Sequence, residues 1–124
     1  MDFKFQRNFS QNDRKIESAR VRINHPDKIP VICEINESSQ NLSSNYILNH
    51  KLIKSKYLVN EDMTIVQFTQ VIRGKLKLDK GAALFIIING RMPSSTQLMS
   101  VLYKQYQNED GFLYIMYCFE NVFG

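Results

Sequence analysis

The sequence has no long hydrophobic segment and almost no cysteine or histidine among its 124 residues. Its longest apolar run, residues 82–88, is far shorter than the ~20 residues that span a bilayer. Charged side chains are scattered through the first twenty residues, which argues against a signal peptide. Asp2 stands where N-myristoylation requires a glycine. We therefore expect the protein to be made and kept in the cytosol.

The two cysteines and two histidines do not suggest a redox or metal site. Cys33 and Cys118 each lie in a strand-like segment, and thiols of a cytosolic protein are more often buried apolar side chains than a disulfide. His25 and His50 are too few and too poorly partnered to suggest metal ligation. No nucleophile, base and orienting group form a recognisable set. We therefore expect neither an enzyme nor a cofactor.

The charge balance is only mildly basic. Sixteen lysines and arginines face 12 acidic residues, which gives a net charge of +4 and a weak attraction to acidic peptides, anionic lipid or nucleic acid. An RNA-binding domain would need exposed aromatic pairs on a sheet and a strong basic stripe. The basic residues before residue 23 are instead interspersed with acidic ones. We therefore predict no nucleic-acid partner.

Residues 1–26 are predicted to form an N-terminal helical region. Ser10 and Asp13 have the spacing of an N-cap and its first turn. Four side chains at helical spacing can share one face, partly through an arginine stem, and we expect this face to pack on the rest of the domain: Ile16, Ala19, Arg20 and Ile23. Pro26 should end the helix because the residue before a proline avoids the α region.

Three phenylalanines alternate with basic residues at the N-terminus: Phe3, Phe5 and Phe9 with Lys4 and Arg7. This pattern fits an arm that touches a membrane or a partner. It fits packing against the domain at least as well.

The remaining chain alternates short strand-like and helical segments. Strands are predicted at 28–35, 56–59, 83–88 and 112–119 from β-branched or continuous apolar residues. Thr64-x-x-Gln67 is a capping box that opens an amphipathic helix. The segment 94–96 offers caps for another helix, whose apolar side holds Leu98, Met99, Leu102, Tyr103 and Tyr106. The polar residues 36–45 predict a loop.

This order of elements predicts an α+β fold, the ubiquitin-like β-grasp with an additional N-terminal helical region. The first and last long strands should be central neighbours, with the helix that follows Thr64 laid across them. A chain of this length and a hydrophobic content of 44% suit one core. We divide the sequence into an N-terminal helical extension (1–26), a ubiquitin-like domain (27–119) and a flexible C-terminal tail (120–124).

Short motifs in this order resemble the autophagy ubiquitin-like modifiers, the lipid-conjugated family that includes GABARAP. The resemblance covers nearly the whole chain. It rests on Arg14-Lys15-x-Glu17-Ser18, Ile29-Pro30-Val31-Ile32-Cys33-Glu34, Lys56-Tyr57-Leu58-Val59, Gln67-Phe68 with Val71-Ile72-Arg73, Leu98-Met99-Ser100, Asp110-Gly111-Phe112-Leu113-Tyr114 and Glu120-Asn121-x-Phe123-Gly124. Each motif is weak alone, whereas the set is specific.

The resemblance implies conjugation through Gly124. Its carboxylate would be activated, carried as a thioester and transferred to the amine of phosphatidylethanolamine. The implied partners are the activating and conjugating enzymes of the ubiquitin-like pathway, a deconjugating cysteine protease, and the membrane through the covalent lipid. The implied location is cytoplasmic, with a lipidated pool on autophagosomal or other intracellular membranes.

The resemblance also implies a docking surface for cargo receptors that carry an aromatic-x-x-aliphatic motif. A partner peptide would add as a strand beside residues 56–59. The aromatic pocket would be lined by Glu17, Pro30, Ile32, Lys56, Leu58 and Phe112. The aliphatic pocket would be lined or supported by Tyr57, Val59, Met63, Phe68, Val71 and Ile72, and acidic flanks would meet Lys28 and Arg73. Periodicity alone would instead place Ile32, Phe68, Val71 and Ile72 in the core.

The sequence departs from the family pattern at identifiable places. Asn60 stands where proline is usual, Lys28 where arginine is usual and Gly74 where a basic residue is common. The connection between residues 35 and 55 is several residues longer, and we expect its segment 37–45 to alter partner choice. The alternative function is a non-conjugated ubiquitin-like interaction domain in vesicle trafficking.

Overall fold

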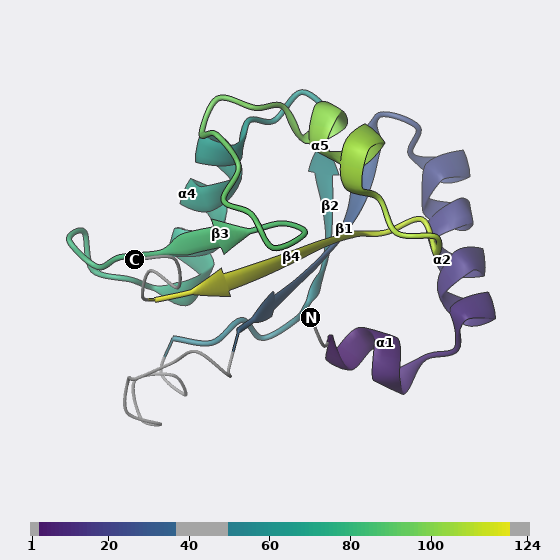
Figure 1. The fold of residues 1–124 in the computed structure, drawn as a ribbon, viewed down its shortest axis with the longest axis horizontal. Helices are drawn as coiled ribbons and strands as arrows, with labels where there is room; N and C mark the ends of the chain where they lie inside the picture. Colours follow the sequence, from purple (N-terminus) through teal and green to yellow (C-terminus); the bar gives the residue numbers. More distant parts are fainter. Residues whose placement is uncertain (1–2, 37–49, 120–124) are drawn as a thin grey trace.

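A computed structural model describes residues 3–36 and 50–119. Its sheet has the strand order β2-β1-β4-β3 (Figure 1). The strands are β1 (Lys28–Ile35), β2 (Lys56–Asn60), β3 (Phe85–Ile87) and β4 (Leu113–Cys118). The central strands β1 and β4 are parallel, and each outer strand is antiparallel to its neighbour. The predicted pairing of the first and last long strands is therefore confirmed, although β3 is shorter than the apolar run that predicted it.

Four helices of the described residues pack around this sheet. They are α1 (Lys4–Asn8), α2 (Gln11–Asn24), α4 (Ile65–Leu76) and α5 (Met99–Tyr106). Figure 1 shows α4 and α5 over one part of the sheet, with α1 and α2 on the other side of the molecule. No helix among residues 3–36 and 50–119 is long and apolar enough to cross a membrane.

Strand alternation divides the buried side chains into two layers, because successive residues of a strand face opposite sides. Ile29, Val31 and Cys33 of β1 join α4 and α5 in the larger core. Ile32 faces the opposite side and packs with Phe3 and Phe5. These two phenylalanines are buried, so packing against the domain is the correct interpretation for them, whereas Phe9 is half exposed.

Local signals fix several element ends as predicted. The Thr64 hydroxyl accepts from the Gln67 main-chain N–H while the Gln67 side chain accepts from the Thr64 N–H, so the capping box is confirmed. The Ser10 hydroxyl caps α2 by accepting from the Asp13 N–H. Asn89 and Gly90 both have positive φ, as the predicted tight turn requires.

The predicted cap of α5 is wrong. The helix begins at Met99, and its N-cap residue, Leu98, provides no side-chain cap. Ser94 lies too early to cap it and instead closes a local turn, in which the Gln97 side chain accepts from the Ser94 N–H at 3.0 Å. Three serine and threonine residues in a row supplied several candidate caps, and the fold uses none of them for this helix.

The predicted packing face of α2 is also wrong. Ile16 and Ile23 are exposed, Ile23 by 78%, and Ala19 and Arg20 lie on the same exposed side. The buried residue of α2 is Ser18, which the apolar pattern did not mark. The helix therefore docks through polar contacts, whose partners lie more than ninety residues away in sequence.

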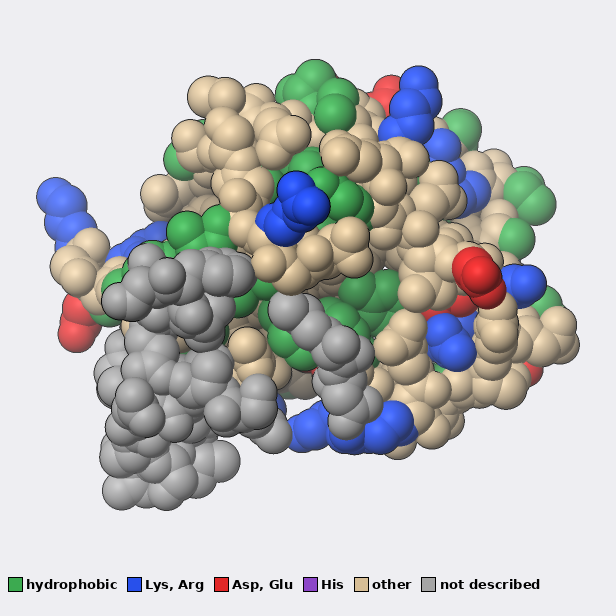
Figure 2. Space-filling model, viewed as in Figure 1, with side chains coloured by type: hydrophobic (Ala, Val, Ile, Leu, Met, Phe, Trp, Pro, Cys, Tyr) green, Lys and Arg blue, Asp and Glu red, His purple; other side chains and the backbone are tan. Residues whose placement is uncertain are grey.

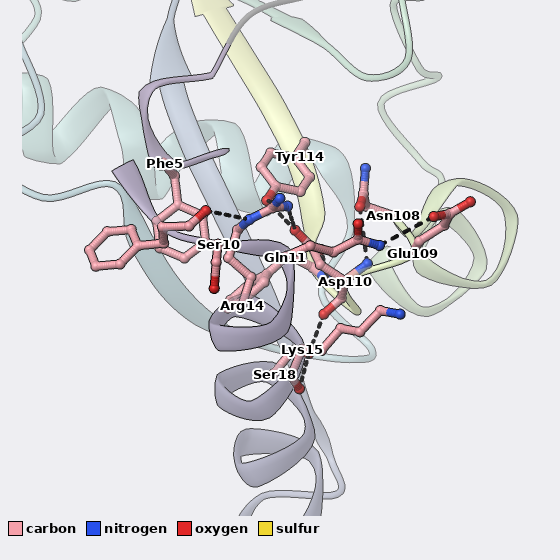
Figure 3. Close-up of polar contacts among 12 residues, drawn as sticks. Phe5, Ser10, Gln11, Arg14, Lys15, Ser18, Asn108, Glu109, Asp110 and Tyr114 are labelled. Atoms are coloured by element: carbon pink, nitrogen blue, oxygen red, sulfur yellow. Dashed lines mark hydrogen bonds and ion pairs between the residues drawn. The ribbon is translucent and has the colours of Figure 1, made fainter. Parts of the chain in front are cut away.

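Those contacts centre on the buried carboxylate of Asp110 (Figure 3). Its Oδ2 accepts from Arg14 Nη1 and from the Tyr114 hydroxyl, each at 2.5 Å. Its Oδ1 accepts from the Phe112 N–H at 2.9 Å, and its main-chain carbonyl accepts from the Ser18 hydroxyl. Asp110 thus joins α2 to the start of β4.

Gly111, the next residue, is required by this close approach. Its φ is +91°, and a Cβ built on it would lie 2.3 Å from Ser18 Oγ. We expect Gly111→Ala to lower the free energy of unfolding by about 2 kcal/mol or more, because it adds backbone strain and pushes α2 away. Gly81→Ala is the matched control, since nothing lies within 4 Å of its Cβ position. Equal denaturant midpoints for the two variants would contradict this packing.

Cys33 and Cys118 are buried thiols that form no disulfide with each other, as predicted. They lie on opposite faces of the sheet, because one belongs to each core layer. Burial raises the pKa of the Cys33 thiol, so the thiolate needed for reactivity is suppressed.

Candidate functional site

In the described part of the chain, β2 is an outer strand of the sheet, paired on one side only. The Cys33 N–H donates to the Ser55 carbonyl at 2.8 Å, and the Glu61 N–H donates to the Asp27 carbonyl at 3.1 Å. These bonds bracket the β1–β2 ladder. Because bonded and non-bonded pairs alternate in an antiparallel ladder, they define which main-chain groups of β2 face inward.

The alternation makes Val31↔Tyr57 and Ile29↔Val59 the hydrogen-bonded pairs. Pro30, which has no N–H, falls opposite Leu58 in a non-bonded pair, as the proline requires. Lys56 and Leu58 therefore direct their N–H and C=O groups to the outer edge, and Asn60 directs its N–H there. This edge can accept a further strand.

The residues predicted to line the aromatic pocket lie on one side of this edge. Leu58 is 48% exposed, whereas Ile32 and Phe112 are almost completely buried and Pro30 is also buried. The Lys56 ammonium pairs with the Glu17 carboxylate across the space between β2 and α2. The structure thus brings all six residues to one face, with Leu58, Lys56 and Glu17 accessible and the other three beneath.

The residues predicted to line or support the aliphatic pocket lie on the opposite side, on β2, on α4 and in the turn that joins them. Val71 is 41% exposed and Met63 is partly exposed, whereas Val59, Phe68 and Ile72 belong to the larger core. Core packing, the alternative that periodicity favoured, is therefore correct for Phe68 and Ile72 and wrong for Val71. The buried members can support a pocket but not line its mouth.

Tyr57 links this pocket to two lysines that the sequence analysis did not include. Lys54 Nζ and Lys75 Nζ each lie 5.6 Å from the centre of the Tyr57 ring. The Tyr57 hydroxyl donates to the Lys54 carbonyl at 2.8 Å, and burial raises its pKa to about 12. Lys75 follows Val71 by four residues in α4, and this spacing was the available signal that both share one helix face.

The two residues expected to meet acidic flanks already have partners within the chain. The Arg73 guanidinium donates to the carbonyls of Ala82 at 2.6 Å, Asp79 at 2.8 Å and Lys80 at 3.3 Å. The Lys28 ammonium donates to the Asn60 side-chain carbonyl. Arg73 therefore positions the loop after α4, and Lys28 holds the end of β2.

The basic residues are dispersed on the face shown in Figure 2. Lysine and arginine side chains are scattered over this face, near its middle as well as at its edges, and are not gathered in one stripe. This face therefore offers isolated charges for acidic side chains. It does not present a continuous track for a phosphate backbone.

Comparison with known proteins gives one consistent result. The family described as "Autophagy protein Atg8 ubiquitin like" matches residues 13–124. Autophagy-related protein 8 of Schizosaccharomyces pombe is 44% identical over 124 residues, covering 100% of this chain and 96% of the relative. Its counterpart in Pichia angusta is 45% identical over 111 residues, covering 90% of this chain and 82% of the relative. The crystal structure of Trypanosoma brucei ATG8 has a TM-score of 0.85 and 34% identity, covering 100% of both chains.

The mixed sheet, the packing of α4 against its central strands in the larger core and this structural similarity define a ubiquitin-like protein with N-terminal helices. The family match covers most of the sequence, and the relatives match along nearly all of it. The chain belongs to the Atg8 family of autophagy-related ubiquitin-like proteins. That family consists of ubiquitin-like modifiers and adaptors and is not a family of catalytic enzymes.

Proposed function

We propose that this protein acts in autophagosome formation in two ways. It is conjugated through Gly124 to phosphatidylethanolamine, and it docks cargo receptors that carry an aromatic-x-x-aliphatic motif. The observation that carries the docking proposal is the outward-facing main chain of β2, with accessible apolar side chains on both sides of it.

The spacing of the motif suits this geometry. In an extended peptide, residues three apart point to opposite faces and lie ~10 Å apart, at ~3.3 Å per residue. A peptide strand added beside β2 can therefore place its aromatic residue toward Leu58 and α2, and its aliphatic residue toward Val71 and α4. An even spacing would direct both anchors to the same face.

Cations around the edge favour an acidic partner. Lys54 and Lys75 flank Tyr57, and Lys56 shares its charge with the single carboxylate of Glu17. Each exposed charge contact should contribute only about 0.2–1 kcal/mol. Apolar anchors and main-chain bonds should therefore supply most of the affinity, and the lysines should supply selectivity.

Docking is tested by binding an aromatic-x-x-aliphatic peptide to the full chain. We expect Leu58→Ala to weaken binding about 5- to 30-fold, because apolar contact worth about 1–2 kcal/mol is lost. Lys56→Ala should weaken it about two- to fivefold. Met92→Ala, which truncates an exposed apolar side chain outside this site, is the control. Equal affinity of all four proteins would disprove docking at β2.

Conjugation accounts for membrane association. The net charge of +4 would hold the protein to anionic membranes only loosely. Two acyl chains, at ~0.8 kcal/mol per buried CH₂, would hold it stably. The partners are activating and conjugating enzymes and a deconjugating cysteine protease. A cytoplasmic pool then exchanges with a lipidated pool on autophagosomal or other intracellular membranes.

Gly124, the tail 120–124 and the segment 37–45 lie outside the described residues. The conjugation proposal therefore rests on the family assignment and on the chemistry of a glycine carboxylate. A glycine acyl group has no side chain to obstruct a narrow enzyme cleft and adopts conformations closed to other residues. The proposal that 37–45 alters partner choice rests on its place in the sequence before β2.

A further inference from the structure

Asn60, the last residue of β2, lies opposite Lys28 in the ladder. The neighbouring pair Ile29↔Val59 is hydrogen-bonded, so Lys28↔Asn60 is a non-bonded pair. The flanking bond from the Glu61 N–H to the Asp27 carbonyl, 3.1 Å long, gives the same alternation. The Asn60 main-chain N–H therefore faces the outer edge of the sheet, in line with those of Lys56 and Leu58.

The rest of Asn60 is committed to the protein. Its main-chain carbonyl accepts from the Met63 N–H at 3.1 Å, which closes the turn after β2. Its side-chain carbonyl accepts from the Lys28 ammonium on the adjacent strand. This side-chain contact draws the amide toward β1 and away from the outer edge. The two family departures, Lys28 and Asn60, thus touch each other and leave one donor facing outward.

We propose that the Asn60 N–H is a third main-chain donor of the docking edge and that it selects partners which stay extended beyond the core motif. Like the docking proposal on which it rests, this concerns strand addition at β2. The acceptor would be a peptide carbonyl about 6.6 Å, or two residues, beyond the one that faces Leu58. A peptide that ends or turns immediately after its core would leave this donor unused.

The test compares three capped peptides on three proteins by calorimetry. The peptides are an acidic aromatic-x-x-aliphatic core and the same core with two alanines added at its N-terminus or at its C-terminus. The proteins are wild type, Asn60→Ala, which keeps the N–H, and Asn60→Pro, which removes it. We expect one extension to tighten binding to wild type about fivefold, the usual effect of one hydrogen bond. Asn60→Ala should keep this gain and Asn60→Pro should lose it.

Hydrogen exchange of the Asn60 amide tests the same hydrogen bond in the wild-type protein, without the proline variant. Exchange of the Asn60 amide proton in wild type should slow when the favoured extended peptide binds and should be unaffected by the core peptide. The core peptide should bind all three proteins within about twofold, because its own bonds to Lys56 and Leu58 are unchanged.

Each failure has a distinct meaning. A gain that survives in Asn60→Pro, the absence of a gain with either extension on wild type, or unchanged Asn60 exchange would overturn the third donor while leaving docking intact. If Asn60→Ala also loses the tighter binding of the extended peptide, the Asn60 side chain causes that tightening. This result too would overturn the proposal of a main-chain donor. If the core peptide fails to bind wild type, the docking proposal falls and this inference falls with it.

Discussion

Replacing Asp110 with alanine should lower the free energy of unfolding by about 3–5 kcal/mol, a large share of the stability of a domain of this size. The side chain of Asp110 is fully buried, and that of Arg14 is 11% exposed. Removing the carboxylate leaves the Arg14 charge and the Tyr114 hydroxyl without their shared acceptor. Leaving one member of a buried ion pair unpartnered costs more than the intact pair contributes.

Tyr114 makes this loss larger than that of a simple ion pair. Burial, and then the hydrogen bond to Asp110, raise the pKa of the Tyr114 hydroxyl. The hydroxyl therefore stays protonated and remains a donor at physiological pH. Its ring packs edge-on against Phe3, with ring centres 4.8 Å apart. Asp110 thus also stabilises the layer beneath α1.

Urea unfolding of the full chain measures this effect. Glu109→Ala is the matched control, because its carboxylate is exposed and accepts only a long 3.3 Å bond from Gln11. We expect that control to stay within about 0.5 kcal/mol of wild type. The double variant Arg14→Ala/Asp110→Ala should be less destabilised than the sum of the single variants, because it leaves no unpaired charge. A cost below about 1 kcal/mol for Asp110→Ala would show that Arg14 relaxes into solvent.

Elements whose stabilising interactions join residues close together in sequence were predicted correctly. The Thr64 capping box and the Asn89-Gly90 turn are complete within a few residues, so the sequence shows every partner. The strands 28–35 and 56–59 were found from side-chain type alone. The family resemblance, and not strand alternation, assigned their residues to the two sides of the edge. These elements determine the docking edge.

The errors came from contacts that are distant in sequence. The face of α2 was assigned from Ile16 and Ile23, yet Ser18 and Arg14 bind Asp110. Apolar periodicity carries no information about a helix that docks through hydrogen bonds. The loop carbonyls bound by Arg73 were equally invisible, because nothing in a sequence marks a main-chain carbonyl as an available acceptor.

The candidate site could be located by family resemblance but not divided into accessible and buried parts. Ile32 and Phe68 occupy family positions of the groove and are also core residues. Only the packed structure separates them from Leu58 and Val71, which a partner can reach. The contact between Lys28 and Asn60 likewise joins two departures that the sequence presents as unrelated.

Deleting Gly124 should abolish lipid conjugation while leaving peptide docking unchanged. The last described residue, Phe119, is buried and packs on Tyr117, with ring centres 5.9 Å apart. The five residues after it can reach at most about 18 Å, at ~3.6 Å each. Activation requires the Gly124 carboxylate to attack the α-phosphorus of ATP and release pyrophosphate. An enzyme cysteine thiolate then displaces AMP to form a thioester, and the lipid amine displaces that thiolate to form the amide.

Without Gly124, the reacting carbonyl would belong to Phe123, which carries a bulky side chain and lies one residue short. Misplacement of this kind can cost ~10²-fold in rate, so we expect no lipidated band after incubation with ATP, both enzymes and phosphatidylethanolamine vesicles. Docking of the aromatic-x-x-aliphatic peptide provides the control, since β2 is untouched. Lipidation of the deletion variant at the wild-type rate would disprove attachment through Gly124. Failure of the wild-type chain itself to become lipidated would favour a non-conjugated interaction domain, in which the β2 edge would act alone.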